Sequence, residues 1–294
     1  MTERPDISIV GAGKVGTALG VLAARAGRRV RAVASRSRTS AEAAAARIEG
    51  AAACGLEDAA GAGELVLLTV PDDAIAALAE RLAPHVRPGA VVAHCSGALS
   101  SEVLAPLRRG SGGIGSMHPL QTFPTVEAAL DRLPGAFYAV EGDETAVVAL
   151  EALVGDLSGR VMAIRPEAKP LYHAGASMAC NYLSTLLDAA GRLAEAAGLD
   201  RAEYMQAIVP VVLATVQNAA TLGPEASLTG PIERGDADTV RRQVAALAGC
   251  ETDLRELFRV LGRSTVDLAR RKGRIGSETA KALAKTLDTL RRRE

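Results

Sequence analysis

The sequence predicts an α/β domain with a doubly wound, mostly parallel sheet, followed by an all-α domain. Three observations indicate this class. Short runs rich in β-branched residues alternate with alanine-rich segments through the first half, as in parallel sheets covered on both faces. A glycine-rich turn directly follows the first run. After Pro166 the strand pattern disappears, so we expect domains at residues 1–165 and 166–294.

The elements of the first domain follow from these runs in chain order. Strands are expected at Ile7–Val10, Arg29–Ala34, Leu65–Val70, Ala90–His94, Gly113–Ser116, Ala136–Val140 and Arg160–Ile164. Helices are expected at Lys14–Ala26, from the capping-box sequence at Thr39 to Gly50, and from Asp72 to Pro84. Because an aspartate at a helix start accepts hydrogen bonds from free amides, we expect Asp72 to cap its helix.

The second domain is expected to consist of long helices. They run from about Pro170 to Ala197, Arg201 to Thr221, Asp238 to Leu247, Thr252 to Arg271 and Ser277 to the end. Asp236 is expected to cap the third of them. The apolar faces of these alanine-rich helices favour burial against a second copy, so we expect a homodimer through this domain.

The composition narrows the possible function classes. Lys+Arg 34 and Asp+Glu 34 balance to zero, which removes a general electrostatic reason to expect nucleic acid or an anionic membrane as partner. With 2% aromatic residues, the chain has few flat side chains for stacking. The four scattered cysteines lack zinc-ligand spacing and indicate a reducing compartment. No leader is visible, and no apolar stretch approaches the ~18 residues of a membrane span, so we expect a cytoplasmic protein without a metal.

A dinucleotide-binding fingerprint follows the first expected strand. Gly11, Gly13 and Gly16 stand at GxGxxG spacing, with Lys14 and Val15 between them, and open the first helix. Such glycines allow a tight turn, close approach of a pyrophosphate and close packing of helix on strand, while the helix amides face the phosphates. A glycine turn with a purely structural role is the alternative. Because strand, position and alternation agree, we expect a Rossmann-type domain with a bound dinucleotide.

The end of the second strand bears on which dinucleotide is bound. Enzymes that use NAD usually place Asp or Glu here to hold the ribose 2′-hydroxyl. This chain has Ser35, Arg36 and Ser37 instead. A guanidinium pairs with a 2′-phosphate through two hydrogen bonds, and hydroxyls can donate to it. We therefore expect NADP, with an exposed basic loop as the alternative.

Two further loops follow strands at the edge where open α/β sheets bind ligands. Val70 and Pro71 follow a buried strand and are expected along the cofactor ribose. Ser96 and Gly97 form a small turn after the next strand, where nicotinamide or substrate can approach. For His94, a core histidine with satisfied hydrogen bonds is the expected role.

The helix after Pro170 and its N-terminal approach carry polar side chains on one face. Lys169, His173, Ser177 and Asn181 recur every four residues. Reduction of a C=O or C=N bond needs a proton donor and a group that polarises the bond. Lys169 or His173 can donate the proton, and Asn181 can orient the substrate. Ser177 is a substrate contact or, preferably, part of a packing stripe, and the alternative for Lys169 is an exposed position.

Two candidates lie outside this helix. His118 follows the Gly113–Ser116 strand, and Pro119 restricts its backbone to extended geometry. Catalytic and structural roles are evenly balanced for His118. Arg234 lies in a Gly- and Pro-rich interruption between helices and can bind a substrate carboxylate through paired hydrogen bonds. An exposed loop arginine is the equal alternative.

The segments GAGKVGTALG, HCSGALS, GSMHPLQTF, YHAGASMACNYL and LTGPIERGD carry a resemblance that covers essentially the whole chain. The chain resembles Rossmann-like oxidoreductases with an uncharacterised helical C-terminal domain. It is similar in layout to pyrroline-5-carboxylate reductase, ketopantoate reductase and deazaflavin-dependent NADP oxidoreductases. The resemblance implies an NADP-linked reductase whose helical domain dimerises. Lys169 is the nearest match to the proton-donating lysine of ketopantoate reductases, while His173 and Asn181 match this family's own motif.

These inferences together predict an NADP-dependent reductase that transfers hydride from NADPH to a small 2-oxo acid or imine. Ketopantoate is the first substrate to test. A non-catalytic NADP-binding sensor or scaffold is one alternative, because no unambiguous acid/base pair is visible. An oxidoreductase that passes hydride to a deazaflavin is another, which the scarcity of aromatic side chains disfavours.

Overall fold

The computed structural model describes residues 4–291. The chain divides into two compact units, Met1–Asn181 and Tyr182–Glu294. This division lies later than the boundary expected near residue 165, because helix α7 (Lys169–Ala179) is bound to the sheet of the first unit. The Lys169 Nζ donates to the Ser96 carbonyl at 2.8 Å and to the Ser116 hydroxyl.

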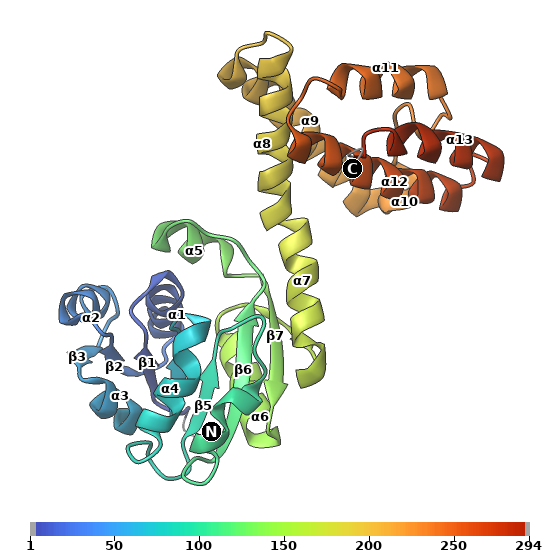
Figure 1. The fold of residues 1–294 in the computed structure, drawn as a ribbon. Helices are drawn as coiled ribbons and strands as arrows, with labels where there is room; N and C mark the ends of the chain where they lie inside the picture. The colour runs from blue at the N-terminus through green and yellow to red at the C-terminus, as the bar shows by residue number, and fades with distance from the viewer. Residues whose placement is uncertain (1–3, 292–294) are drawn as a thin grey trace. The chain divides into compact units, whose positions relative to one another are not determined.

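The first unit contains an eight-stranded sheet with the order β3-β2-β1-β4-β5-β6-β7-β8. Figure 1 shows these strands from β3 at the left to β7 at the right. All neighbours pair in parallel except β6 and β7, which are antiparallel. The strands are β1 (Ile7–Val10), β2 (Val30–Ala34), β3 (Ala52–Cys54), β4 (Leu65–Leu68), β5 (Val91–His94), β6 (Gly113–Pro119), β7 (Phe137–Gly142) and β8 (Arg160–Ala163). The expected doubly wound α/β class is confirmed.

Two hydrophobic cores cover the two faces of the sheet. In β4, Leu65 and Leu67 belong to one core and Val66 and Leu68 to the other. Alternate residues of a strand point to opposite faces, so a strand buried on both sides is a continuous apolar run. The first core includes residues of α1 (Lys14–Arg25), α5 (Val126–Arg132) and α6 (Glu144–Asp156). The second includes residues of α3 (Leu56–Ala62), α4 (Asp72–Leu82) and the 3₁₀ helix η1 (Ser101–Leu107).

In the first unit, the caps of two helices differ from those that the sequence predicts. Helix α2 (Arg38–Ala45) is capped by Ser37, whose hydroxyl accepts from the Ser40 amide at 3.3 Å, and not by a capping box at Thr39. Pro71 is the N-cap of α4 and provides no side-chain cap. The expected cap role of Asp72 is therefore wrong, because its carboxylate binds a neighbouring loop instead.

The second unit is helical. It comprises α8 (Asn181–Ala196), α9 (Arg201–Leu222), α10 (Pro224–Ser227), α11 (Ala237–Leu247), α12 (Thr252–Arg271) and α13 (Ser277–Asp288). Helix α13 packs against both α11 and α12 (Figure 1), and these three helices supply most of one buried core. Asp236 caps α11 as expected, accepting from the Thr239 amide at 3.0 Å. Residues 292–294, part of the last expected helix, lie outside the described residues.

The long helix expected from Pro170 to Ala197 is interrupted at Cys180. Cys180 is the C-cap of α7 and separates it from α8, with a backbone still in the right-handed helical region at φ −114° and ψ −59°. Asn181 is therefore the first residue of α8, whereas His173 and Ser177 belong to α7.

Helix α9 has no buried residue. Val211, Leu213 and Val216 are 57%, 64% and 52% exposed. By length and composition alone, α9 is the one helix among residues 4–291 that is apolar enough to cross a membrane, with a mean hydropathy of 1.4. The expectation that no stretch approaches that length is thus not met by α9.

Candidate functional site

The fingerprint glycines have three different environments. Gly11 has φ +123°, and a Cβ there would lie 2.5 Å from the Thr69 carbonyl oxygen. A Cβ on Gly16 would collide with the Gly11 carbonyl oxygen, so both glycines are required by packing. Gly13 has an ordinary φ of −84°, and a Cβ there would meet nothing within 4 Å. The space above Gly13 is therefore open to a ligand, at the uncapped amides that begin α1.

A pocket of about 350 Å³ begins at this turn. Of the residues predicted to bind cofactor, six line it: Gly11, Gly13, Ser35, Arg36, Val70 and Pro71. Leu56, Leu78 and Arg81 also line it and were not predicted. The pocket has the elements that a dinucleotide needs, namely free helix amides, a cation at the end of β2 and an apolar wall.

Four other residues that were predicted to bind the cofactor do not line this pocket. Lys14 is exposed at the start of α1, and Val15 packs against the core of the first unit. Ser37 caps α2. The Ser96 hydroxyl donates to the Asp72 carboxylate at 2.8 Å and accepts from the amides of residues 98 and 99. Because these bonds use the hydroxyl, Ser96 shapes its loop rather than offering a free group to a cofactor.

His94 has the expected role of a satisfied core histidine. Its side chain is completely buried, its Nδ1 accepts from the Ser96 amide at 3.1 Å, and its Nε2 lies 3.1 Å from the Ser100 carbonyl oxygen. Burial, and then the charge of Lys169, lowers the pKa of His94 to about 4. A neutral ring with hydrogen on Nε2 satisfies both contacts.

Lys169 is buried, so the alternative of an exposed lysine is wrong. Its side chain has no exposed surface, and Nζ lies 3.8 Å from Glu141 Oε1 in addition to its bonds to Ser96 and Ser116. Burial lowers the pKa of Lys169 to about 8, while the Glu141 charge opposes that shift. A lysine in this position ties α7 to the loops after β5 and to β6. These partners enclose Nζ, and the role of Lys169 as proton donor stays a prediction.

Glu141 is the acidic partner of this buried pair. The Ser101 amide and the Ser101 hydroxyl donate to its two oxygens at 2.8 and 2.7 Å. Every charged atom of the pair therefore has a hydrogen-bond partner or an opposite charge, which is what buried charges require.

His118, Tyr172 and His173 are half-buried and form a group of polar rings near this pair. His118 lies inside β6, where it pairs with Ala139 of β7, and not after a strand as expected. Its Nδ1 is 2.9 Å from the Tyr172 hydroxyl oxygen, and its ring centroid is 5.9 Å from that of His173. Tyr172 was not predicted, although it lies three residues after Lys169 and therefore on the same helix face.

Gly97 makes room for these rings. A Cβ on Gly97 would lie 2.8 Å from His118 Nε2 and closer still to the His173 ring. Burial, followed by the charge of Lys169, lowers the pKa of His118 to about 4, so its imidazole is neutral at pH 7. Burial raises the pKa of Tyr172. The group offers a phenol hydroxyl and the neutral imidazole of His118, which suits proton donation to a neutral double bond.

The remaining predicted residues are not part of this group. Ser177 is half-buried on α7 one turn after His173, and Asn181 is exposed at the first position of α8. Arg234 is an exposed residue of the second unit, in the turn before α11. The neighbouring Glu233 accepts from Lys272 and Arg274 at 3.1 and 3.0 Å, which anchors that turn. The substrate roles of these residues stay predictions.

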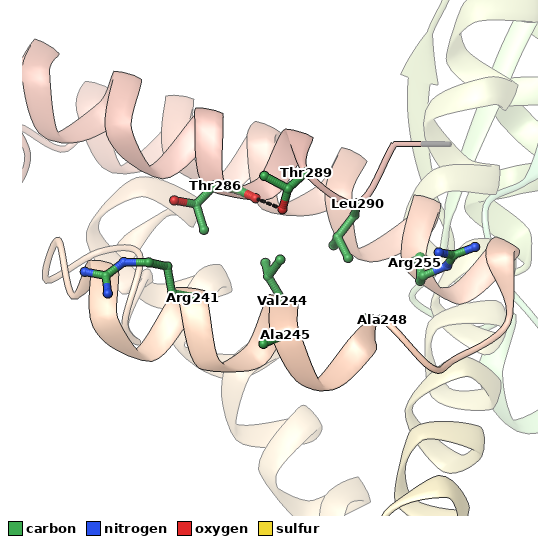
Figure 2. A pocket seen from close by; sticks show the side chains of 8 residues that line it. All are labelled: Arg241, Val244, Ala245, Ala248, Arg255, Thr286, Thr289 and Leu290. Atoms are coloured by element: carbon green, nitrogen blue, oxygen red, sulfur yellow. Dashed lines mark hydrogen bonds between the residues drawn. The ribbon is translucent and has the colours of Figure 1, made fainter. Parts of the chain in front are cut away.

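The second unit has a pocket of about 450 Å³ between α11 and α13 (Figure 2). Val244, Ala245 and Leu290 line its middle, and Arg241 and Arg255 stand at its ends. None of the predicted site residues lines it. Between residues 4 and 291, no cluster of three or more histidine, cysteine or carboxylate side chains is placed to hold a metal ion.

Two family models match the chain. Residues 1–119 match a Rossmann-like domain, and residues 136–265 match the domain of unknown function DUF2520. The layout inferred from the sequence motifs, a Rossmann-like domain followed by an uncharacterised helical domain, is confirmed. No curated protein has a sequence that matches this chain.

Several solved structures have a similar fold. BF3122 of Bacteroides fragilis, provisionally named an NADP oxidoreductase, is 24% identical with a TM-score of 0.74, over 90% of this chain and 98% of that one. Protein TM1727 of Thermotoga maritima is 26% identical with a TM-score of 0.68, over 97% and 100%. A reductive aminase of Aspergillus terreus, in complex with NADPH and ethyl levulinate, is 16% identical with a TM-score of 0.66, over 96% and 99%.

Proposed function

We propose that this protein is an NADP-dependent reductase of a small molecule with a C=O or C=N bond. The observation that carries the proposal is the pocket that joins the open space above Gly13 to Arg36. A carboxylate at the end of β2 would repel a 2′-phosphate, and no acidic residue lines this pocket. The NADP oxidoreductase, reductive aminase and imine reductase among the similar structures support the same chemistry.

The nucleotide pocket and the histidine group lie along one edge of the sheet. Pro71 lines the pocket, and the next residue, Asp72, accepts from the Ser96 hydroxyl. The residue after Ser96 is Gly97, which contacts the rings of His118 and His173. Since the carboxyl ends of parallel strands meet at the same edge, a ligand that leaves the pocket over Pro71 arrives at Gly97.

We assign proton donation to Tyr172 and His118. NADPH, when bound, supplies the hydride. With its proton on Nδ1, the neutral His118 donates to the Tyr172 oxygen and leaves the phenol hydrogen free for the substrate. The same bond stabilises the phenolate that forms as the proton leaves. His173 lies against Gly97 beside His118 and is placed to orient the substrate.

The substrate class that we propose is a small 2-oxo acid or an imine, with ketopantoate the first compound to assay. The nearest lysine, Lys169, is buried and paired, so it cannot bind a substrate carboxylate. A 2-oxo acid therefore needs another cation, and the sequence proposes Arg234 of the second unit as a carboxylate ligand. A neutral imine needs only the phenol and imidazoles.

We also propose a homodimer formed through the helical domain, in the cytoplasm, without nucleic acid or membrane as partner. The exposed apolar side chains of α9 support pairing of two copies, because large apolar side chains exposed to water are unfavourable. A mass measurement in solution tests this, and a monomer at micromolar concentration would contradict it.

Oxidation of NADPH in the presence of 2-oxo acids, ketones with amines, and cyclic imines tests the function. We expect turnover with at least one class and its loss in Tyr172→Phe. If NADPH binds but no compound is reduced, the protein is an NADP-binding sensor and not a reductase. If neither NADPH nor NADH binds, the nucleotide pocket itself has been misassigned.

A further inference from the structure

Two arginines from different elements line the nucleotide pocket. Arg36 follows β2, and Arg81 lies in the last turn of α4. In a dinucleotide fold the adenosine ribose lies at the end of the second strand, so Arg36 marks the adenosine end of the pocket. Arg81 has no role in the function proposed above.

Arg81 completes one wall of the pocket. Ala74, Ala77, Leu78 and Arg81 all line it, at a spacing that places them on a single face of α4. This face is apolar up to Arg81, whose carbon stem can extend it. None of the lining residues is aromatic, so a flat base entering here finds no aromatic ring to stack on.

The guanidinium of Arg81 is held in place by Glu57. Its Nε and Nη2 lie 2.7 and 2.6 Å from the same Glu57 oxygen, at the start of α3. The Arg81 hydrogen bond contributes to the lowered pKa of Glu57, after the backbone bond within Glu57 itself. Arg36, in contrast, has no ion pair with any residue between 4 and 291. Glu57 therefore holds Arg81 in one orientation. Arg36 is free to bind a phosphate.

We propose that Arg81 is the stacking surface for the adenine of NADPH, that Glu57 is the residue that positions it, and that Arg36 alone binds the 2′-phosphate. The proposal rests on the nucleotide site proposed above. A guanidinium is planar and stacks on aromatic faces, which gives a protein of few aromatic residues a way to hold a base. Because NADPH and NADH share the adenine, Arg81 contributes equally to the affinity of both.

The test is the dissociation constant of NADPH and of NADH, measured by titration with the full-length protein, without substrate. Arg81→Ala is expected to weaken both by the same factor, about threefold to thirtyfold, and Arg81→Lys nearly as much, because lysine keeps the charge but not the plane. Arg36→Ala is expected to weaken NADPH selectively. Glu57→Ala is expected to weaken both ligands, and Glu57→Gln to retain most of the affinity through its amide oxygen.

Arg87→Ala is the matched control. Arg87 is similarly exposed and forms an ion pair with Glu64 at 3.4 Å, but it does not line the pocket. If Arg81→Ala binds both nucleotides as tightly as Arg87→Ala does, the proposal is wrong. A loss confined to NADPH, rescued by Arg81→Lys, would instead make Arg81 a phosphate ligand and also overturn it. Absence of binding of either nucleotide to the wild-type protein would overturn the proposed function as well.

Discussion

The buried Lys169 gives a pH dependence of stability that can be worked out in sign and size. Its pKa is lowered from 10.5 to about 8, chiefly because burial disfavours the charged form. Between these values the unfolded chain holds a proton that the folded protein has lost. Stability therefore rises with pH from about 8 to 10.5, and below that window Lys169 adds no pH dependence. The total gain is about 3 kcal/mol.

The measurement is urea unfolding of the wild type and of Lys169→Met, which keeps the side-chain volume but cannot ionise. Other groups titrate in both proteins, so the difference in unfolding free energy isolates Lys169. We expect the wild type minus variant difference to be constant from pH 6 to 7.5 and to increase by about 3 kcal/mol by pH 10.5. Lys14→Met, at an exposed position of α1, is the control for the loss of a lysine side chain.

A constant difference across pH 8 to 10.5 would refute the reasoning, because it would mean that Lys169 titrates as it does in the unfolded chain. At pH 7 the variant also leaves Glu141 buried without its cation. Removing one partner of a buried pair costs about 3–5 kcal/mol, and the two bonds from Ser101 favour the lower end. Combining Lys169→Met with Glu141→Gln should recover part of that loss.

Three further predictions concern the site. Tyr172→Phe should lower kcat about 100-fold or more while the dissociation constant of NADPH stays within twofold; an unchanged kcat would remove Tyr172 from the reaction. Gly97→Ala should abolish turnover, because the Cβ would lie 2.8 Å from His118 Nε2, and a fully active variant would show that the rings do not stand where substrate binds. Gly13→Ala should leave the thermal midpoint unchanged, since its Cβ would meet nothing within 4 Å, yet weaken NADPH at least about tenfold by blocking close approach. Equal affinity in that variant would argue against a pyrophosphate at this turn.

The fold was largely predictable because most of the predicted strands are apolar runs that contain β-branched residues. Strand β3 was missed since its sequence, two alanines and a cysteine, has no such preference. Helices α3, α5 and α6 were also not predicted. The antiparallel direction of β7 could not be predicted, because side-chain alternation is the same in either direction.

The site was predictable where a sequence motif by itself fixes the local backbone geometry. GxGxxG located the nucleotide pocket, and His118 and His173 are indeed neighbours. The burial of Lys169 could not be inferred, because nearby prolines suggest an exposed segment. Tyr172 and Arg81 were detectable in principle: each lies three residues beyond another residue of its site on the same helix face. The four-residue pattern of polar side chains does not include Tyr172, and no sequence motif marks the last turn of α4, which carries Arg81.

The exposed apolar side chains of α9 affect how these measurements can be compared. If two copies bury them against each other, association stabilises the folded state by mass action. Dilution would then lower the midpoint of thermal unfolding even when pH and salt are fixed. Wild type and variants are therefore comparable only at one protein concentration, and a concentration series on the wild type alone would report the strength of that association.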